Sequence, residues 1–244
     1  MAQASSPSAS IRAARSMAAH ARRSCRRLHR ASFGAGWRFS GSAGGLGYYP
    51  PPDLSRLGTA DLADLFVGNL YELNDARASG PPAGRPRVQA LEPLPRFWDF
   101  GGRAEFCGRI ATVQCFENNL QIRALLSEPG GGRVLVADTA GSARAALLGD
   151  NLAELAVRSG WAGVLLNGFL RDAACLRKMP IGIKALGTYP VKSGKRDWGI
   201  AGVPLHFGGV TFRPGDYLYA DEDGILVADS DLRALAAEGV GSGA

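Results

Sequence analysis

The body of this 244-residue chain alternates segments that favour strands with segments that favour helices. From Gly101, GRIATVQC has the β-branched alternation of a strand, NLQIRALLSE predicts a helix, and GGRVLVAD is a glycine turn followed by a buried strand. An Ala/Leu-rich stretch from about Ser142 to Ser159 predicts further helix, and the strand AGVLLN comes next. This β-α-β-α-β order predicts a sheet with helical crossovers.

The pattern changes after Pro180 to short strands and turns, in GIKALGTYPV, GGVTF, RPGDYLYAD and DGILVAD. The sequence therefore predicts one domain over residues 56–232, with an α/β half and a mostly β half. We expect residues 1–55 to form a leader and a linker rich in Gly and Pro, and residues 233–244 to form a C-terminal tail. With 46% hydrophobic residues, the chain is long enough for one domain and an appendage.

Positive charge is concentrated at the N-terminus. Residues 1–52 hold eight arginines and neither lysine nor acid: Arg12, Arg15, Arg22, Arg23, Arg26, Arg27, Arg30 and Arg38. Subtracting their +8 from the total of +6 leaves −2 for the rest, so a nucleic-acid-binding face on the domain is poorly supported. Arg-rich, Ser-rich, acid-free leaders are typical of organelle import. We expect a mitochondrial presequence; a plastid transit peptide and a disordered nucleic-acid-binding tail are the alternatives.

No apolar run approaches the ~18 residues of a membrane span, so we expect no membrane partner.

Cysteine and histidine usage excludes several kinds of site. The four cysteines, Cys25, Cys107, Cys115 and Cys175, form no Cys-x-x-Cys pair, which favours a reducing compartment and buried thiols. Because His206 is the one histidine beyond the leader, a histidine-rich zinc site is excluded and a Ser-His-Asp triad would depend on that residue.

Gly149-Asp150 interrupts the long helical stretch. Gly, Asp and Asn end helices more readily than they continue them, and Asn151-x-x-Glu154 matches a capping box. The sequence therefore predicts a new helix beginning at Asn151, whose first amides, from Asn151 to Ala153, form a cup for an anion such as a carboxylate. The alternative is a kinked helix with an ordinary cap.

The stretch GVLLNGFLRDAACL begins with a predicted strand, and we expect that strand to stop at Asn167-Gly168. Arg171-Asp172 comes shortly after it. An exposed ion pair is the simplest interpretation. In an open α/β sheet, however, ligands bind where strands end and helices begin, which places this pair near the predicted cup. Arg171 could then reach a keto oxygen beside a bound carboxylate. Asp172 could hold Mg²⁺ or Mn²⁺, since hard cations prefer carboxylate and water.

Several spaced motifs resemble one family, that of regulator of ribonuclease activity A and 4-hydroxy-4-methyl-2-oxoglutarate aldolase. The similarity runs from about Thr59 to Asp229. It is carried by Thr59–Asp64 (TADLAD), Phe100–Ala104 (FGGRA), Thr112–Asn119 (TVQCFENN), Gly149–Leu152 (GDNL), Asn167-Gly168 with Arg171-Asp172, and Phe207–Val210 (FGGV) with Pro214–Asp216 (PGD).

The resemblance implies a swivelling β/β/α domain of the phosphohistidine-domain-like type, assembled as a homotrimer or a dimer of trimers with active sites at subunit contacts. It also implies a division by function. Aldolase members carry Arg-Asp or Arg-Glu after the strand, whereas the bacterial ribonuclease regulator lacks the acid. Arg171-Asp172 therefore favours a divalent-metal-dependent (class II) aldolase that cleaves 4-hydroxy-4-methyl-2-oxoglutarate to two pyruvates, with oxaloacetate decarboxylase side activity. A non-catalytic module that binds and inhibits a ribonuclease is the alternative.

Each site residue then has an expected role toward a small 2-keto acid. Asp172 is the metal ligand, Arg171 stabilises the enolate oxygen, and the amides of Gly149, Asp150, Asn151 and Leu152 bind the carboxylate, with Asp150 also holding a water that supplies a proton.

The competing enzyme class is a Schiff-base aldolase using Lys184 or Lys192. For Asn119 we expect helix capping, for Glu117 a surface or capping role, and for Cys107 and Cys115 places in the core.

Overall fold

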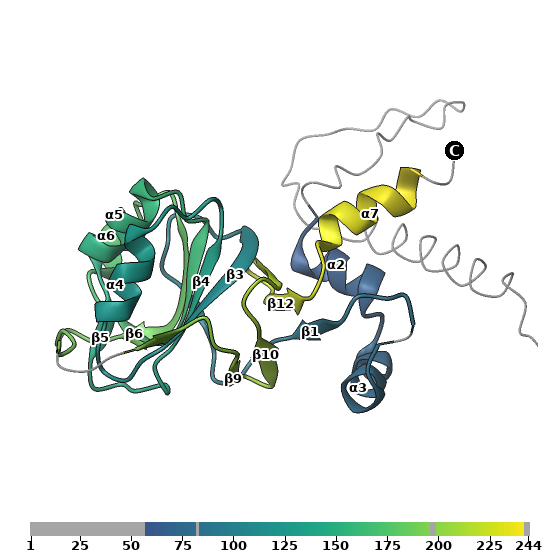
Figure 1. Ribbon diagram of the computed structural model, residues 1–244, viewed down its shortest axis with the longest axis horizontal. Coiled ribbons are helices and arrows are strands. Elements are labelled where there is room, and N and C mark those ends of the chain that lie inside the picture. Colours follow the sequence, from purple (N-terminus) through teal and green to yellow (C-terminus); the bar gives the residue numbers. More distant parts are fainter. Residues whose placement is uncertain (1–56, 82, 196–198, 242–244) are drawn as a thin grey trace, which may run out of the picture.

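The computed structural model describes residues 57–81, 83–195 and 199–241 (Figure 1). The leader predicted for residues 1–55, with its targeting role, lies outside the described residues. Within the described part, no helix is both long and apolar enough to span a bilayer.

Four parallel strands form the centre of the main sheet. They are β3 (Phe106–Gln114), β4 (Val134–Asp138), β6 (Gly163–Leu170) and β7 (Gly182–Thr188). The connecting helices are α4 (Leu120–Ser127), α5 (Asp150–Arg158) and the short α6 (Ala173–Leu176). They lie together on one face of these strands, as expected when each parallel pair needs a crossover (Figure 1).

Antiparallel strands extend the sheet on the β3 side and close it on the β7 side. The order is β1-β12-β11-β3-β4-β6-β7-β2, with β5 beside β6 and β8 beside β3. The bounds are β1 (Val88–Ala90), β2 (Trp98–Asp99), β5 (Ala146–Leu148), β8 (Ile200–Ala201), β11 (Tyr217–Ala220) and β12 (Ile225–Ala228). A separate hairpin pairs β9 (Leu205–Phe207) with β10 (Val210–Phe212). The predicted α/β half and mostly β half are both present.

The apolar core has three parts. One lies between the helices and the sheet and includes Leu126, Leu152 and Leu166. A second lies under the β9–β10 hairpin, around Phe106 and Phe212. The third joins β1, β11 and β12 to the helices α2 (Thr59–Phe66) and α7 (Leu232–Gly241).

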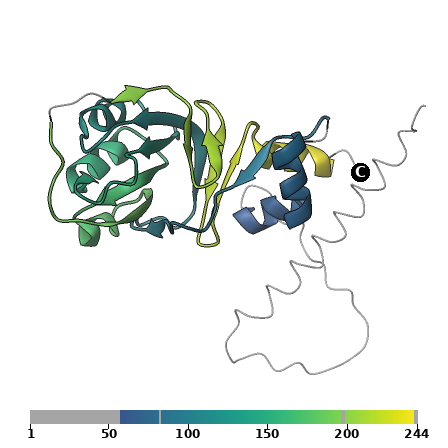
Figure 2. The same cartoon turned by 90° about the horizontal axis from the view of Figure 1, so that it is seen from below.

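The terminal helices form a group at the end of the molecule away from α4 and α5 (Figure 2). Besides α2 and α7, the group holds α3 (Leu70–Ser79), which has no buried residue. The helix expected from Thr59 is confirmed as α2. Residues 233–241, assigned to a tail from the sequence, belong to α7, whose Leu232 and Ala236 are buried.

Two sequence predictions around the candidate site were wrong. The stretch from Ser142 to Ser159 is not one helical region, because Ala146–Leu148 is a fully buried strand, β5, parallel to β6. Tertiary pairing thus overrides the helix propensity of Ala and Leu. The helix that follows begins at Asp150 with Gly149 as its N-cap, so the capping box at Asn151 is not formed.

The strand that leads to Arg171 is also longer than predicted. β6 passes through Asn167-Gly168 and ends at Leu170, with a shift of its register against β7 between Leu166 and Phe169. Gly168 allows this close passage: a Cβ there would lie only 2.1 Å from Thr139 Oγ1. The glycine therefore marks an irregularity inside the strand and not its end.

Candidate functional site

The candidate site lies where β5 and β6 end side by side. Leu148 and Leu170 are partners in the parallel ladder, and the amide of Arg171 donates to the carbonyl of Leu148 at 3.0 Å. The chain leaves β5 through Gly149 into α5, and it leaves β6 through Arg171 into α6. The two sequence motifs are thus brought together, as predicted, although the strand β5 that leads to Gly149 was not expected.

Arg171 and Asp172 form a half-exposed ion pair. Arg171 Nε lies 3.3 Å from Asp172 Oδ2, and the two side chains are 38% and 35% exposed. Asp172 has φ 61° and ψ 32°, the left-handed region, which aspartate tolerates better than most non-glycine residues. Its carbonyl accepts from the amides of Cys175 and Leu176, so the first turn of α6 holds the backbone in place.

Gly149 lies directly against this pair. A Cβ added at Gly149 would stand 2.8 Å from Asp172 Oδ2, 3.4 Å from Arg171 Cγ and 3.5 Å from Arg171 Nε. The backbone there is extended, with φ −151° and ψ −173°, so glycine is needed for space and not for conformation. The start of α5 therefore brings the positive end of the helix dipole to the carboxylate and guanidinium.

The predicted anion cup is mostly closed by the protein's own acceptors. The amides of Leu152 and Ala153 both donate to the carbonyl of Gly149, at 3.2 and 3.0 Å. The amide of Asn151 donates to Asp150 Oδ1 at 2.7 Å, and Asn151 Nδ2 donates to the same oxygen at 3.0 Å. Among the amides predicted to bind a carboxylate, those of Asn151, Leu152 and Ala153 thus already have partners. This leaves the start of the helix at Gly149 and Asp150 as the place where a ligand could approach.

The two lysines of the Schiff-base alternative differ in their surroundings. Lys184, on β7, is buried, and its Nζ lies 2.8 Å from Asp99 Oδ1 and 2.9 Å from Oδ2. A buried ammonium held by a carboxylate is a structural ion pair and not a nucleophilic amine. Lys192 is exposed at the edge of β5, opposite Ala146.

Asn119 does not cap its helix as expected, whereas Glu117 lies in a partly exposed ion pair, in agreement with the surface role expected for it. Asn119 is at the N-cap position of α4, but its side chain donates to the carbonyl of Leu147 in β5 at 3.0 Å. Asn118 supplies the cap, since its Oδ1 accepts from the amide of Leu120. Glu117 accepts from Ser142 Oγ at 2.7 Å and pairs with Arg144 at 3.0 Å, so it fastens the loop that leads to β5.

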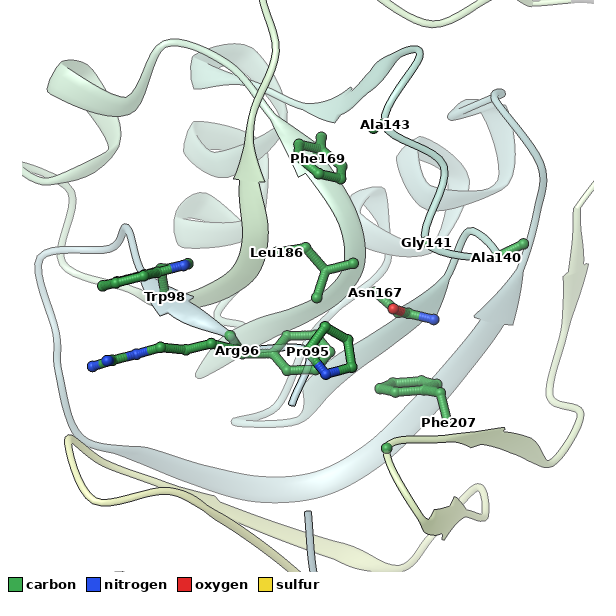
Figure 3. A pocket seen from close by; sticks show the side chains of 12 residues that line it. Pro95, Arg96, Trp98, Ala140, Gly141, Ala143, Asn167, Phe169, Leu186 and Phe207 are labelled. Atoms are coloured by element: carbon green, nitrogen blue, oxygen red, sulfur yellow. The ribbon is translucent and has the colours of Figure 1, made fainter. Parts of the chain in front are cut away.

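An open pocket of about 570 Å³ lies beside this site and was missed by the sequence reasoning (Figure 3). Its aromatic and apolar lining comes from segments far apart in the sequence: Phe97, Trp98, Phe169, Leu186 and Phe207. Neither Arg171 nor Asp172 lines it. In the sequence, Phe169 looks like one more apolar residue of a buried strand. The pocket is not visible there, because only the tertiary fold brings Phe169 together with the other lining side chains.

Comparison with known proteins decides the family. The family model for "RraA-like: Aldolase/RraA" matches residues 59–227. The chain belongs to the RraA-like family. The resemblance read from the sequence motifs is thereby confirmed, as is the mixed α/β single domain.

Two relatives of this RraA-like protein share one functional name. A protein of Alkalilimnicola ehrlichii is 54% identical over 174 residues, 71% of this chain and 96% of its own, and one of Laribacter hongkongensis is 51% identical over 146 residues, 60% and 91%. Both are named "Putative 4-hydroxy-4-methyl-2-oxoglutarate aldolase".

Solved structures carry other names on the same fold. The RNA-processing inhibitor RraA of Thermus thermophilus matches with a TM-score of 0.57 and 48% identity, over 59% of this chain and 86% of that one. A Geobacillus kaustophilus structure, titled as an S-adenosylmethionine:2-dimethylmenaquinone methyltransferase, matches with a TM-score of 0.63 and 46% identity, over 73% and 98%. Because one fold carries these different names, function has to be argued from the site.

The donor set of this RraA-like site fits a hard divalent cation held by one carboxylate. Among the described residues, no group of three or more His, Cys, Asp or Glu side chains is placed to hold a metal. Asp172 Oδ2 faces Arg171, while Oδ1 has no partner in the described structure and the side chain is one-third exposed. Mg²⁺ is commonly bound through one or two carboxylates, with water and substrate oxygens completing its shell.

Proposed function

We propose that this protein is a divalent-metal-dependent carbon–carbon lyase that cleaves 4-hydroxy-4-methyl-2-oxoglutarate to two pyruvates. The observation that carries the proposal is the Arg171–Asp172 pair held against Gly149 at the start of α5. A substrate with adjacent carboxylate and keto oxygens suits this arrangement. Its oxygens are negative or become so, and a bound cation, the guanidinium and the helix N-terminus would each attract them.

The reaction needs a stabilised negative charge on the keto oxygen. When the bond between C3 and C4 breaks, its electrons move onto the C2 oxygen as an enolate. The C4 hydroxyl gives up its proton to water and becomes the keto group of the second pyruvate. Loss of carbon dioxide from oxaloacetate produces the same pyruvate enolate. One site that stabilises this charge can therefore serve both reactions.

The chain's own residues have separate tasks in this proposal. Asp172 would hold Mg²⁺ or Mn²⁺, which supplies Lewis-acid polarisation of the keto group when bound. Arg171 stabilises the developing charge, since neither terminal nitrogen of its guanidinium has a partner in the described structure. Gly149 and the beginning of α5 orient the substrate carboxylate, with Asn151 and Leu152 fixing the helix start. Asp150, whose Oδ1 is fixed by Asn151, holds the water that protonates the enolate carbon.

Pyruvate release coupled to lactate dehydrogenase tests the proposal. Activity is expected with Mg²⁺ or Mn²⁺ and is expected to disappear with EDTA and in Asp172→Asn. Glu154→Gln is a matched control, because Glu154 lies in the exposed ion pair with Arg158 one turn further along α5. Full activity after complete removal of divalent metal, or in Asp172→Asn, would overturn the assignment.

Inhibition of a ribonuclease is the second candidate, favoured by the 48% identity to the Thermus structure named for RNA-processing inhibition. A binding surface has no requirement for a metal ligand, so Asp172→Asn would leave inhibition unchanged. Assays of pyruvate release and of RNA cleavage on the same two preparations separate the candidates.

Assembly and location are further parts of the proposal. We infer a homotrimer, or a dimer of trimers, with active sites at subunit contacts. Exposed apolar residues such as Phe116, Val191 and Ile200 suit contacts between subunits. Light scattering after size-exclusion chromatography measures the mass of the assembly.

We also propose that residues 1–55 direct import into mitochondria, with plastids as the alternative. A fusion of this segment to a fluorescent protein shows which organelle receives it.

A further inference from the structure

The pocket beside the candidate site has walls suited to a flat ring. Phe207, at the end of β9, stacks on Phe212 with the ring centroids 4.5 Å apart. The ring of Phe97 lies tilted against that of Phe207, with their centroids 5.9 Å apart. Leu186 of β7 and Trp98 of β2 lie on the other sides (Figure 3). A volume of about 570 Å³ is within the usual range for small-molecule sites, which are mostly apolar with a few placed polar groups.

Asn167 places one unfilled hydrogen-bond acceptor in this apolar space. The residue is only 9% exposed, and its Nδ2 donates to Asp138 Oδ1 at 2.8 Å, which fixes the orientation of the amide because a carboxylate accepts. Asp138 is itself held by the amide of Ala140 at 2.9 Å. Asn167 Oδ1 accepts from no group in the described structure, and Asn167 lines the pocket (Figure 3).

This acceptor faces the open pocket and takes its donor from there. Buried polar atoms are nearly always hydrogen-bonded, and an acceptor facing a cavity is completed by water or by a ligand. The backbone carbonyl of Asn167 is already occupied by Thr139 Oγ1 at 2.7 Å, so the polar function offered to the pocket is the side-chain oxygen alone.

Arg96 supplies a cation at the rim. Its guanidinium carbon lies 4.2 Å from the centroid of the Trp98 ring, which holds the group flat against the indole. No carboxylate of the described structure pairs with it, so it can accept an anionic partner from solution. The pocket thus combines aromatic walls, one acceptor and one positive charge.

We infer that this pocket is a binding site for a small aromatic carboxylate that carries a hydrogen-bond donor on its ring. The ring lies against Phe207 and Leu186, and the donor meets Asn167 Oδ1. The carboxylate meets Arg96 after its exposed side chain turns from its place beside Trp98 toward the pocket (Figure 3). The inference is independent of the proposed lyase activity, since Arg171 and Asp172 do not line the pocket.

Two probes of nearly equal size isolate the role of the acceptor. 4-Aminobenzoate carries a neutral N–H donor opposite its carboxylate, and 4-methylbenzoate replaces that donor with a methyl group. Saturation-transfer NMR and calorimetric titration of the full-length protein are expected to show 4-aminobenzoate binding at least about tenfold more tightly, because the methyl group would leave the acceptor unpaired. Equal affinities, or no binding of either probe, would overturn the inference without using any variant.

Four variants locate the bound probe. Ala143→Trp, which fills the pocket from the loop after β4, is expected to abolish binding. Arg96→Gln is expected to weaken binding about tenfold. Arg109→Gln is its control, since Arg109 is also next to an aromatic ring, that of Tyr217 at 5.1 Å, but does not line the pocket. Arg171→Gln is expected to leave affinity unchanged, and a large loss in that variant would place the probe in the candidate active site and refute the inference.

Discussion

A methyl group added at Gly149 would meet the carboxylate of Asp172. The added Cβ would stand 2.8 Å from Asp172 Oδ2, and ordinary contact begins at 3.4 Å. The carboxylate must therefore move by about 0.6 Å, or the start of α5 must move away from it. The ion pair between Arg171 and Asp172 would change with it, because the same oxygen faces Arg171 Nε at 3.3 Å.

The predicted effect of Gly149→Ala is on activity more than on stability. Alanine is a poorer N-cap than glycine by about 1 kcal/mol, while it reduces the entropy of the unfolded chain by about 0.4–1 kcal/mol. The two contributions oppose each other, so the melting temperature should change by no more than ~4 °C. A misplacement of ~1 Å costs about a hundredfold in rate, so ~0.6 Å predicts a loss of kcat/KM of roughly tenfold to fiftyfold.

The measurement is pyruvate release at saturating Mg²⁺, together with thermal unfolding of the same samples. Gly224→Ala is the matched control: Gly224 lies in the turn between β11 and β12, and a Cβ there has nothing within 4 Å. If Gly149→Ala keeps activity within twofold of the parent and unfolds at the same temperature, the contact between Gly149 and Asp172 does not matter for chemistry, and the site proposed here is wrong.

The remaining predictions concern a metal ligand, a buried lysine and a buried thiol. Asp172→Asn should lower kcat/KM at least about a thousandfold without changing the far-ultraviolet circular dichroism. Lys184→Met should cost ~2 kcal/mol in urea unfolding, since it leaves the one-third exposed Asp99 without its cation, and borohydride with substrate should trap no adduct on Lys184 in the parent. Burial raises the pKa of Cys115 from 9.0 to about 11. The folded state therefore holds this proton more tightly than the unfolded state, so stability should fall between pH 9 and 11, and Cys115→Ala should reduce that fall. Alkylation at pH 8 with peptide mapping should modify the exposed Cys175 and spare Cys115.

The order of elements could be predicted because each signal was local. The strands β3, β4 and β6 and the helix α4 each show their own periodicity, and a glycine or polar turn separates one from the next. Cys115 was expected in the core and is buried there, whereas Cys107 is half-buried against the terminal helices.

The errors came from contacts that no local pattern reports. Asn167-Gly168 resembles the end of a strand, yet β6 continues because Asn167 bonds to Asp138 and Gly168 passes close to Thr139. Asn151 resembles a helix cap, yet the helix starts earlier because Leu148 pairs with β6 and fixes where the strand ends. The pocket could not be predicted at all, since its lining comes from five separate segments.

The misread strand β5 is the element that creates the candidate site. If Ser142 to Ser159 formed one helix, Gly149 would lie in its interior and its neighbouring amides would bond to carbonyls one turn back, with no helix start to face a ligand. Instead, the amide of Ala146 donates to the carbonyl of Val191 at 2.8 Å on one side of β5, and the carbonyl of Leu148 accepts from Arg171 at 3.0 Å on the other. These bonds hold three helix-forming residues in a strand. They therefore both begin α5 at Asp150 and place Arg171 beside it, so the chemistry proposed here depends on tertiary hydrogen bonds as much as on the identity of the reactive side chains.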